Sequence, residues 1–188
     1  MRGPSQREKL PNKFFCCLLL FLLLSAGCTS SDRDWRTASR QSAGIAPDPG
    51  QTSEAILQVY AARAWGWRGW FAVHTWIATK RSTEPFYIVY EVIGWRENRG
   101  LPVLRIEKDA PDRYWFGEKP KLLADHRGDG VDALIEAVES AAASYPWPQT
   151  YRVFPGPNSN TFTAWVAREV PELELTLPFS AIGRGYAD

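Results

Sequence analysis

Cysteine is nearly absent from this chain of 188 residues, and its placement excludes several kinds of site. All three cysteines fall within the first 28 residues, so the rest of the chain contains no disulfide, no cysteine nucleophile and no thiolate metal site. Histidine is almost as scarce, with only His74, expected within a strand, and His126, expected in a solvated polar turn. Two histidines in such different settings argue against a zinc site. We expect neither a metal nor another cofactor.

Neither sign of charge dominates the sequence. The chain has 22 basic and 21 acidic residues and a formal net charge of +1. Residues 1–27 hold four of the basic and one of the acidic residues, which leaves the remainder with a net charge of −2. Nucleic-acid binding depends on a concentrated basic face, and this balance indicates none. We therefore expect no nucleic-acid partner.

Residues 1–27 are typical of a secretory signal peptide. Four basic residues precede an apolar run, 14–24, that is too short to cross a bilayer comfortably. The run ends in Ser25-Ala26-Gly27-Cys28, which resembles the lipobox of bacterial lipoproteins, although serine stands where leucine is most common. The resemblance implies cleavage before Cys28 and a diacylglycerol on its sulfur. An uncleaved signal anchor is the alternative.

A lipidated Cys28 would anchor the chain in the cell envelope, facing the periplasm. Thr29 follows it, and the lack of an aspartate there favours the outer membrane by analogy with other lipoproteins. Residues 28–51 are polar, with serines and prolines, and are expected to form a flexible tether. Residues 52–188 are then expected to form a single globular domain, because their number suits one core.

Residues 52–188 predict an α+β domain with a mainly antiparallel sheet and two main helices, because strands come first and helices later. The expected strands are 55–65, 71–79, 86–93, 101–106 and a short one at 151–154, and residues 122–126 are expected to form one helical turn. The expected helices are 131–144, capped by Asp129, and a second helix that ends at Pro171.

The second helix begins in a polar cluster, Asn158-Ser159-Asn160-Thr161, that follows a loop rich in proline and glycine. The unpaired N–H groups and positive dipole end of a helix start can bind an anion or support a nucleophile. The same side chains also suit a plain helix cap. The cluster is therefore a candidate binding site or nucleophile site, with Ser159 as the nucleophile.

His74 and Glu91 are candidate partners for that chemistry. His74 lies on a strand and is either a core histidine or a general base. Glu91 interrupts an otherwise apolar strand, and a carboxylate there needs a partner. It could orient His74 or form a salt bridge with one of three arginines, and base rates favour the salt bridge. Those three arginines are Arg63, Arg68 and Arg96.

The chain has nine tryptophans, four of them between residues 65 and 76. Aromatic side chains bury large areas, so core packing is one explanation. A groove that faces a glycan or a lipid is the other, and it would include Trp65, Trp67, Trp70 and Trp76.

Several aromatic motifs occur together in this chain. They include Ala64-Trp65-Gly66-Trp67, Val73-His74-Thr75-Trp76 and Pro155-Gly156-Pro157-Asn158-Ser159-Asn160-Thr161-Phe162. In this order they resemble the bacterial Domain of Unknown Function 3750 family over roughly residues 55–186. The family name implies no activity.

A more distant resemblance concerns circularly permuted papain-like enzymes, the relatives of lecithin:retinol acyltransferase. In these enzymes an early strand carries a histidine, and a helix start carries the nucleophile in an Asn-Cys-x-x-Phe pattern. Here His74 lies on an early strand, and Asn158 to Phe162 matches the pattern except that Ser159 replaces the cysteine. The resemblance implies either a serine nucleophile served by its base or a fold reused without catalysis.

Two hypotheses follow for an envelope lipoprotein of this kind. The first is a non-catalytic module that binds an envelope glycan, peptide or lipid through Trp76 and the polar helix start, Asn158, Asn160 and Thr161. The second is a hydrolase or acyltransferase that uses Ser159 and His74, with Glu91 to orient the histidine. They differ in whether Ser159 and His74 approach each other.

Overall fold

The structure is a computed structural model that describes residues 34–187, and these residues form one compact unit. The expected signal peptide and Cys28 lie outside the described residues. The strands are β1 (Ile56–Arg63), β2 (Val73–Lys80), β3 (Ile88–Val92), β4 (Leu104–Lys108) and β5 (Lys121–Arg127). The long helices are α2 (Val131–Ala143) and α3 (Ser159–Glu169), and the 3-10 helices are η1 (Gly66–Trp70), η2 (Gly94–Arg99), η3 (Pro171–Leu173) and η4 (Arg184–Ala187).

The five strands form one sheet in the order β4-β3-β2-β1-β5, and every neighbouring pair is antiparallel. The expected α+β class, with its antiparallel sheet and two main helices, is confirmed. Side chains alternate between the two faces along each strand, as the pleat of a β-strand requires. In β2 this alternation sends Thr75 and Ile77 to one face and His74 and Trp76 to the other.

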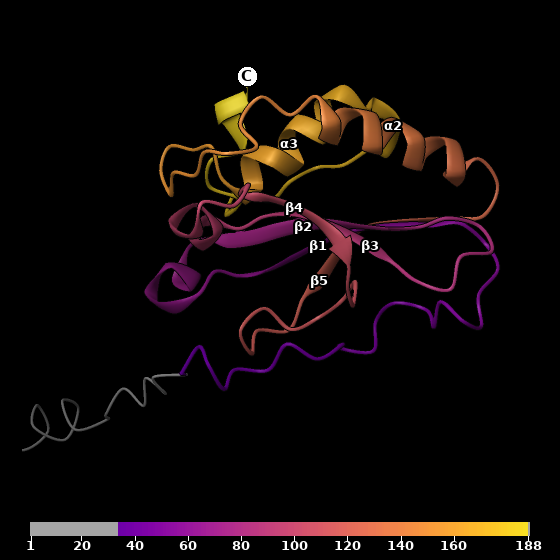
Figure 1. The fold of residues 1–188 in the computed structure, drawn as a ribbon, viewed down its shortest axis with the longest axis horizontal. Helices are drawn as coiled ribbons and strands as arrows, with labels where there is room; N and C mark the ends of the chain where they lie inside the picture. Colours follow the sequence, from indigo (N-terminus) through magenta and orange to yellow (C-terminus); the bar gives the residue numbers. More distant parts are fainter. Residues whose placement is uncertain (1–33, 188) are drawn as a thin grey trace, which may run out of the picture. The chain divides into compact units, whose positions relative to one another are not determined.

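The helices α2 and α3 cover one face of the sheet (Figure 1). Their buried side chains, among them Ile135, Val138, Phe162 and Val166, pack with the β1 and β3 residues that point the same way. Both helices bury one apolar stripe, as a period of 3.6 residues allows. We call this side the helix-covered face.

The opposite face is covered by irregular chain, and this corrects the expected tether. Ala38, Ile45 and Ala46 pack beside a buried cluster that includes Trp76, Trp115 and Phe116. In Figure 1 the indigo and purple chain that contains them runs beneath the sheet. The folded body therefore begins before residue 52. We call this side the loop-covered face.

The carboxylate of Asp112 holds this N-terminal segment in place. It accepts hydrogen bonds from the Ser42 hydroxyl at 2.7 Å and the Ala46 N–H at 3.1 Å, as well as one from the Ile45 N–H. Asp112 is 1% exposed, so its charge depends on these donors. Backbone contacts from Tyr114 to Gln41 and from Gly117 to Ser39 extend the attachment.

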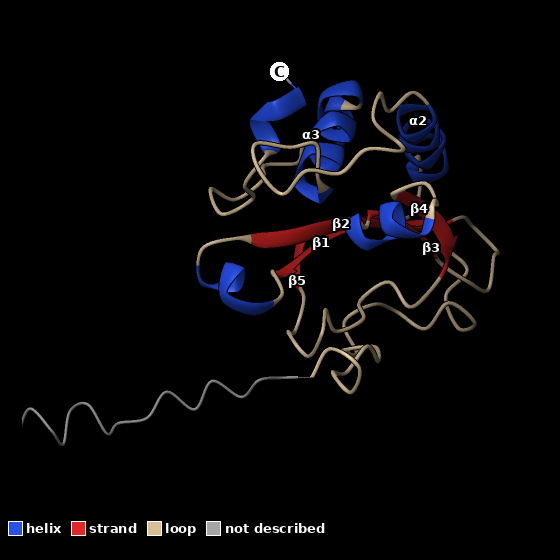
Figure 2. Cartoon of the chain, turned by 60° about the vertical axis from the view of Figure 1, so that its left-hand side comes forward, coloured by secondary structure: helices blue, strands red, loops and turns tan. Residues whose placement is uncertain are grey.

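Three local expectations were wrong. Residues 122–126 belong to strand β5 because they pair with β1, which is visible only in three dimensions (Figure 2). Residues 151–154 form no strand and adopt loop and bend structure instead. The cap of α2 is Gly130, which adopts a left-handed conformation, rather than Asp129. No helix among residues 34–187 is long and apolar enough to cross a membrane.

Candidate binding site at the end of the sheet

A pocket of about 600 Å³ opens at the end of the sheet, where β1 and β3 finish and β2 begins. Its volume falls within the range of about 300–1,000 Å³ that is common for ligand sites. We call it the end pocket. Its aromatic lining comprises Trp65, Trp67, Phe71, Trp95, Trp115, Tyr151 and Phe154. Its polar lining includes His74, Asn98, Asn158, Ser159 and Asn160.

Asn158 is the N-cap of α3, so the capping interpretation of the polar cluster is correct for this residue. Its side-chain oxygen accepts from the backbone N–H groups of Asn160 and Thr161, and the Thr161 hydroxyl accepts from the Asn158 N–H at 3.1 Å. The Asn158 amide nitrogen donates to the carbonyls of Val153 and Ile182, both at 3.1 Å. One asparagine thus joins the helix start, the preceding loop and the C-terminal segment.

Gly183 is needed beside this cap. A Cβ atom at position 183 would lie 2.4 Å from the Asn158 amide nitrogen, and the glycine has a φ of +94°. Both the space and the backbone conformation therefore suit only glycine.

Asn160 ties α3 to the start of β2. Its amide donates to the carbonyls of Val73 at 3.0 Å and Ile182 at 2.8 Å, and its oxygen accepts from the Thr75 hydroxyl at 3.0 Å. Thr75 also lies 2.9 Å from the Thr163 hydroxyl. These neutral groups satisfy one another beneath the helix start, and this fixes the wall of the end pocket.

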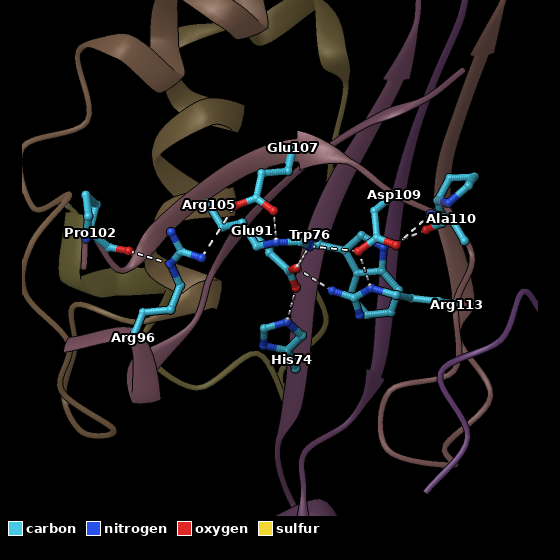
Figure 3. Close-up of polar contacts among 11 residues, drawn as sticks. His74, Trp76, Glu91, Arg96, Pro102, Arg105, Glu107, Asp109, Ala110 and Arg113 are labelled. Carbon is cyan, nitrogen blue, oxygen red and sulfur yellow. Dashed lines mark hydrogen bonds and ion pairs between the residues drawn. The ribbon is translucent and has the colours of Figure 1, made fainter. Parts of the chain in front are cut away.

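His74 reaches the end pocket from the loop-covered face. Its ring stacks on Trp115 at a centroid distance of 3.6 Å and an interplanar angle of 9°. Its Nε2 lies 3.4 Å from Oε2 of Glu91 (Figure 3). Burial lowers the pKa of His74 despite the opposing effect of Glu91, so the ring is neutral at pH 7. A neutral ring that donates from Nε2 leaves Nδ1 as an acceptor.

Glu91 is fully buried and belongs to an ionic cluster with Asp109, Arg105 and Arg113. One Glu91 oxygen accepts from Arg105 Nη1 at 2.6 Å and from Arg113 Nη2. Both guanidinium groups also contact Asp109 (Figure 3). We call these four residues the Glu91 cluster. Its formal charges cancel, which is the condition for burying them.

The Glu91 pKa reflects these competing effects. Burial alone would raise it, but the hydrogen bond with His74 and the charge of Arg113 lower the pKa of Glu91 to about 2. The expected salt bridge therefore exists, but Arg105 and Arg113 replace the expected arginines, Arg63, Arg68 and Arg96. Arg105 lies directly opposite Glu91 on the neighbouring strand β4.

Ser159 and His74 do not form the pair that the hydrolase or acyltransferase hypothesis requires. Thr75, the residue after His74, points at the start of α3, so His74 points to the opposite face of the sheet. Within residues 34–187 the Ser159 side chain makes no hydrogen bond, and His74 instead contacts Glu91. Ser159 contributes its backbone carbonyl, which accepts from Thr75 and Thr163. The two side chains share the pocket lining without the contact that a nucleophile and its base require.

Three further expectations fail on burial or position. Trp76 is fully buried, donates from Nε1 to the Pro111 carbonyl at 2.7 Å and does not line the end pocket. Thr161 is also fully buried and donates to the Gly183 carbonyl at 2.7 Å. His126 lies on β5 with its Nε2 3.1 Å from the Leu173 carbonyl, so it is not in the solvated polar turn that was expected.

The sequence reasoning missed part of the aromatic lining. Phe71, Trp95 and Phe154 line the pocket and are 53%, 42% and 77% exposed. Each lies in a loop or 3-10 helix, where no periodicity distinguishes a pocket residue from a core residue. Within the described part of the chain, no group of three or more His, Cys, Asp or Glu side chains is placed to hold a metal ion.

Comparison with known proteins identifies a family. Residues 54–186 match the family described as Protein of unknown function (DUF3750). No curated protein and no solved structure matches the chain. The family resemblance read from the aromatic motifs is therefore confirmed, whereas the papain-like arrangement stays a prediction.

Proposed function

The chain belongs to the DUF3750 family, and we propose that it is a lipid-anchored envelope protein whose domain binds a ligand in the end pocket without catalysing a reaction. The ligand is a glycan, peptide or lipid of the envelope. The observation that carries this proposal is the concentration of partly exposed aromatic side chains around one pocket with amide and imidazole groups at its base.

Exposed aromatic clusters on a monomer mark interaction surfaces, because water leaves such surfaces readily. Trp67 and Phe154 are 69% and 77% exposed at the pocket rim and offer flat faces to a ring or chain. The amides of Asn158 and Asn160 are already held by backbone carbonyls, so they form a rigid wall. The neutral His74 ring supports binding by hydrogen bonding and needs no change of charge at pH 7.

Intrinsic tryptophan fluorescence of the full chain in neutral detergent tests the binding. We would titrate soluble muropeptides, an unrelated peptide and a short-chain phosphatidylcholine as three separate probes. One probe is expected to change the fluorescence saturably, and Trp67→Ala is expected to weaken its binding about tenfold. Trp70→Ala is the matched control, because Trp70 is 83% exposed in the same 3-10 helix but does not line the pocket. Equal losses in both variants, or no saturable probe, would overturn the proposal.

The anchor is tested separately by intact-mass analysis of the chain purified from bacterial membranes. The wild-type protein is expected to begin at Cys28 and to carry the mass of a diacylglycerol. Cys28→Ser is expected to retain the full precursor mass. A wild-type chain that keeps residues 1–27 without added lipid would refute the anchor and leave the pocket binding unaffected.

A further inference from the structure

A second, smaller pocket of about 360 Å³ lies next to the end pocket. Three arginines, Arg40, Arg68 and Arg99, line it together with four aromatic side chains. The aromatic residues are Trp35, Trp65, Trp95 and Phe116. No carboxylate contributes to this lining. We call it the arginine pocket.

The three arginines differ from most others in the structure. Nine of the thirteen described arginine side chains form an ion pair or donate a hydrogen bond to a backbone carbonyl. Within residues 34–187, only four side chains do neither, namely Arg40, Arg68, Arg99 and Arg152. Three of the four meet in this pocket, although they come from three separate segments.

Such an arrangement leaves positive charge uncompensated. Like charges that line one pocket repel one another, and an anion that enters relieves the repulsion. Arg40 is the one member with a partner inside the pocket, because its guanidinium lies 4.5 Å from the centroid of the Phe116 ring. A ring contact of this kind leaves the guanidinium N–H groups available to an anion.

We infer that the arginine pocket binds a phosphate group carried on a sugar or a glycerol, and that the rest of this ligand extends into the end pocket. This inference rests on the proposed binding function. Guanidinium groups match phosphate oxygens by paired hydrogen bonds, and three of them offer more donors than a carboxylate can accept. Aromatic walls around the arginines suit a phosphate attached to a ring or chain more than a free ion.

The two pockets are continuous in their lining. Trp65, Arg68 and Trp95 line both of them. A ligand with its phosphate near Arg68 would therefore place its neutral part against the tryptophans that lead to Asn158 and Asn160. This placement gives the ligand two chemically different ends, one anionic and one uncharged.

The test measures binding to the full chain in neutral detergent by tryptophan fluorescence, with hexose 1-phosphate, the neutral hexose, inorganic phosphate and soluble short-chain phosphatidylglycerol as probes. A phosphorylated probe is expected to bind at least about tenfold more tightly than its neutral counterpart, and more weakly as salt rises. Preference for the hexose phosphate or for the phosphatidylglycerol identifies the source of the phosphate. If inorganic phosphate binds as tightly as the hexose phosphate and the phosphatidylglycerol, the inference that the ligand extends into the end pocket is overturned.

Charge-removing variants locate the site. Arg68→Gln with Arg99→Gln is expected to abolish the preference for the phosphorylated probe. Arg152→Gln is the matched control, because Arg152 is exposed and equally unpaired but lines neither pocket. Equal losses in the two variants would refute the site.

The outcome separates this inference from the proposed function. If neutral probes bind in a Trp67-dependent way and phosphate adds nothing, the phosphate inference fails and the binding function stands. If no probe binds at all, both fail.

Discussion

The two faces of the sheet are buried by different means. On the helix-covered face α2 and α3 pack with apolar side chains, and the side chains of Asn158, Asn160 and Thr161 at the start of α3 are neutral and hydrogen-bonded. The loop-covered face buries the Glu91 cluster, His74 and Asp112 beneath loops and the N-terminal segment. The stability of this second face therefore depends on charge pairing and on chain that has no regular structure.

The difference affects function because the end pocket is lined by residues from both faces. The neutral face supplies a rigid amide wall, whereas the charged face supplies His74, Trp115 and Phe116. Buried ion pairs tolerate the loss of one partner poorly, and neutral hydrogen bonds tolerate it better. Variants should therefore be more harmful on the loop-covered face.

Removal of residues 1–51 tests the loop-covered face most severely. Asp112 would lose the donors from Ser42, Ile45 and Ala46, and the buried cluster around Trp76 would lose the apolar cover that the segment provides. We expect a loss of about 4 kcal/mol in the free energy of unfolding, measured by urea titration. A chain that starts at Asp34 is the control and should keep the full value. Equal urea midpoints for the two chains would show that residues 34–51 contribute nothing to stability.

Replacement of Glu91 tests the buried charge itself. Glu91→Gln removes the one fully buried carboxylate of the Glu91 cluster and leaves Arg113 with Asp109 alone, so we expect a loss of about 3 kcal/mol in urea unfolding. Glu107→Gln is the control, because Glu107 also pairs with Arg105 but its side chain is 50% exposed. The control should cost less than about 1 kcal/mol. A similar cost for both variants would mean that burial does not decide the outcome.

Replacement of Asn158 tests the helix-covered face. Asn158→Ala removes the cap of α3 and two donors to carbonyls, and we expect a loss of about 1.5 kcal/mol in urea unfolding. Ser159→Ala is the control, because the Ser159 hydroxyl makes no hydrogen bond within residues 34–187. It should stay within about 0.5 kcal/mol of the wild type. A large loss in Ser159→Ala would point to a role for the hydroxyl that its contacts do not reveal.

The smallest expected effect is a dependence of stability on mild acid. The folded pKa of His74 lies below its ordinary value of 6.5, so the unfolded chain binds a proton more readily. This contribution to stability is complete above pH 6.5 and is lost as the pH falls toward the lower folded pKa. His74→Gln should flatten the fall in urea midpoint between pH 7 and 5. If the urea midpoint of His74→Gln falls between pH 7 and 5 as steeply as that of the wild type, His74 is not the source of this pH dependence.

Stronger acid should then act on Glu91. Its pKa is about 2 in the folded protein against 4.5 as the ordinary value. A depressed carboxyl pKa stabilises the fold above pH 4.5, and this stabilisation is lost as the pH falls toward 2. In the urea titrations, Glu91→Gln should therefore lose less stability than the wild type below pH 4.5.

Periodicity predicted the helix-covered face better than the loop-covered face. The alternation in β2 and the apolar stripes of α2 and α3 are local patterns, so the sheet, both helices and the placement of His74 opposite Thr75 could be derived. Strand β5 was missed because only its pairing with β1 distinguishes it from a helical turn. The register that sets Arg105 opposite Glu91 is likewise a property of two strands together.

The candidate site was predicted only in part. The polar helix start and His74 do reach the end pocket, whereas Trp76 and Thr161 are buried away from solvent. The arginine pocket escaped prediction because Arg40 lies in a stretch whose serines and prolines suggested a tether, and Arg99 lies in a 3-10 helix. The N-terminal segment is attached through the hydrogen bond from Ser42 to Asp112, which lies 70 positions away. The composition of residues 28–51 alone gives no sign of this contact.

The C-terminal carbonyls that complete the start of α3 also constrain how the domain folds. The Val73 N–H donates to the Ser180 carbonyl, and the carbonyls of Ile182 and Gly183 accept from the side chains of Asn158, Asn160 and Thr161, which we call the α3 cluster. These acceptors follow every strand and both long helices in the chain. A polypeptide made from its N-terminus therefore holds the sheet and helices in full before it can satisfy the α3 cluster. The domain should therefore reach its native state only after synthesis has passed residue 183. Contacts between residues far apart in the chain, such as Val73 with Ser180, also slow folding.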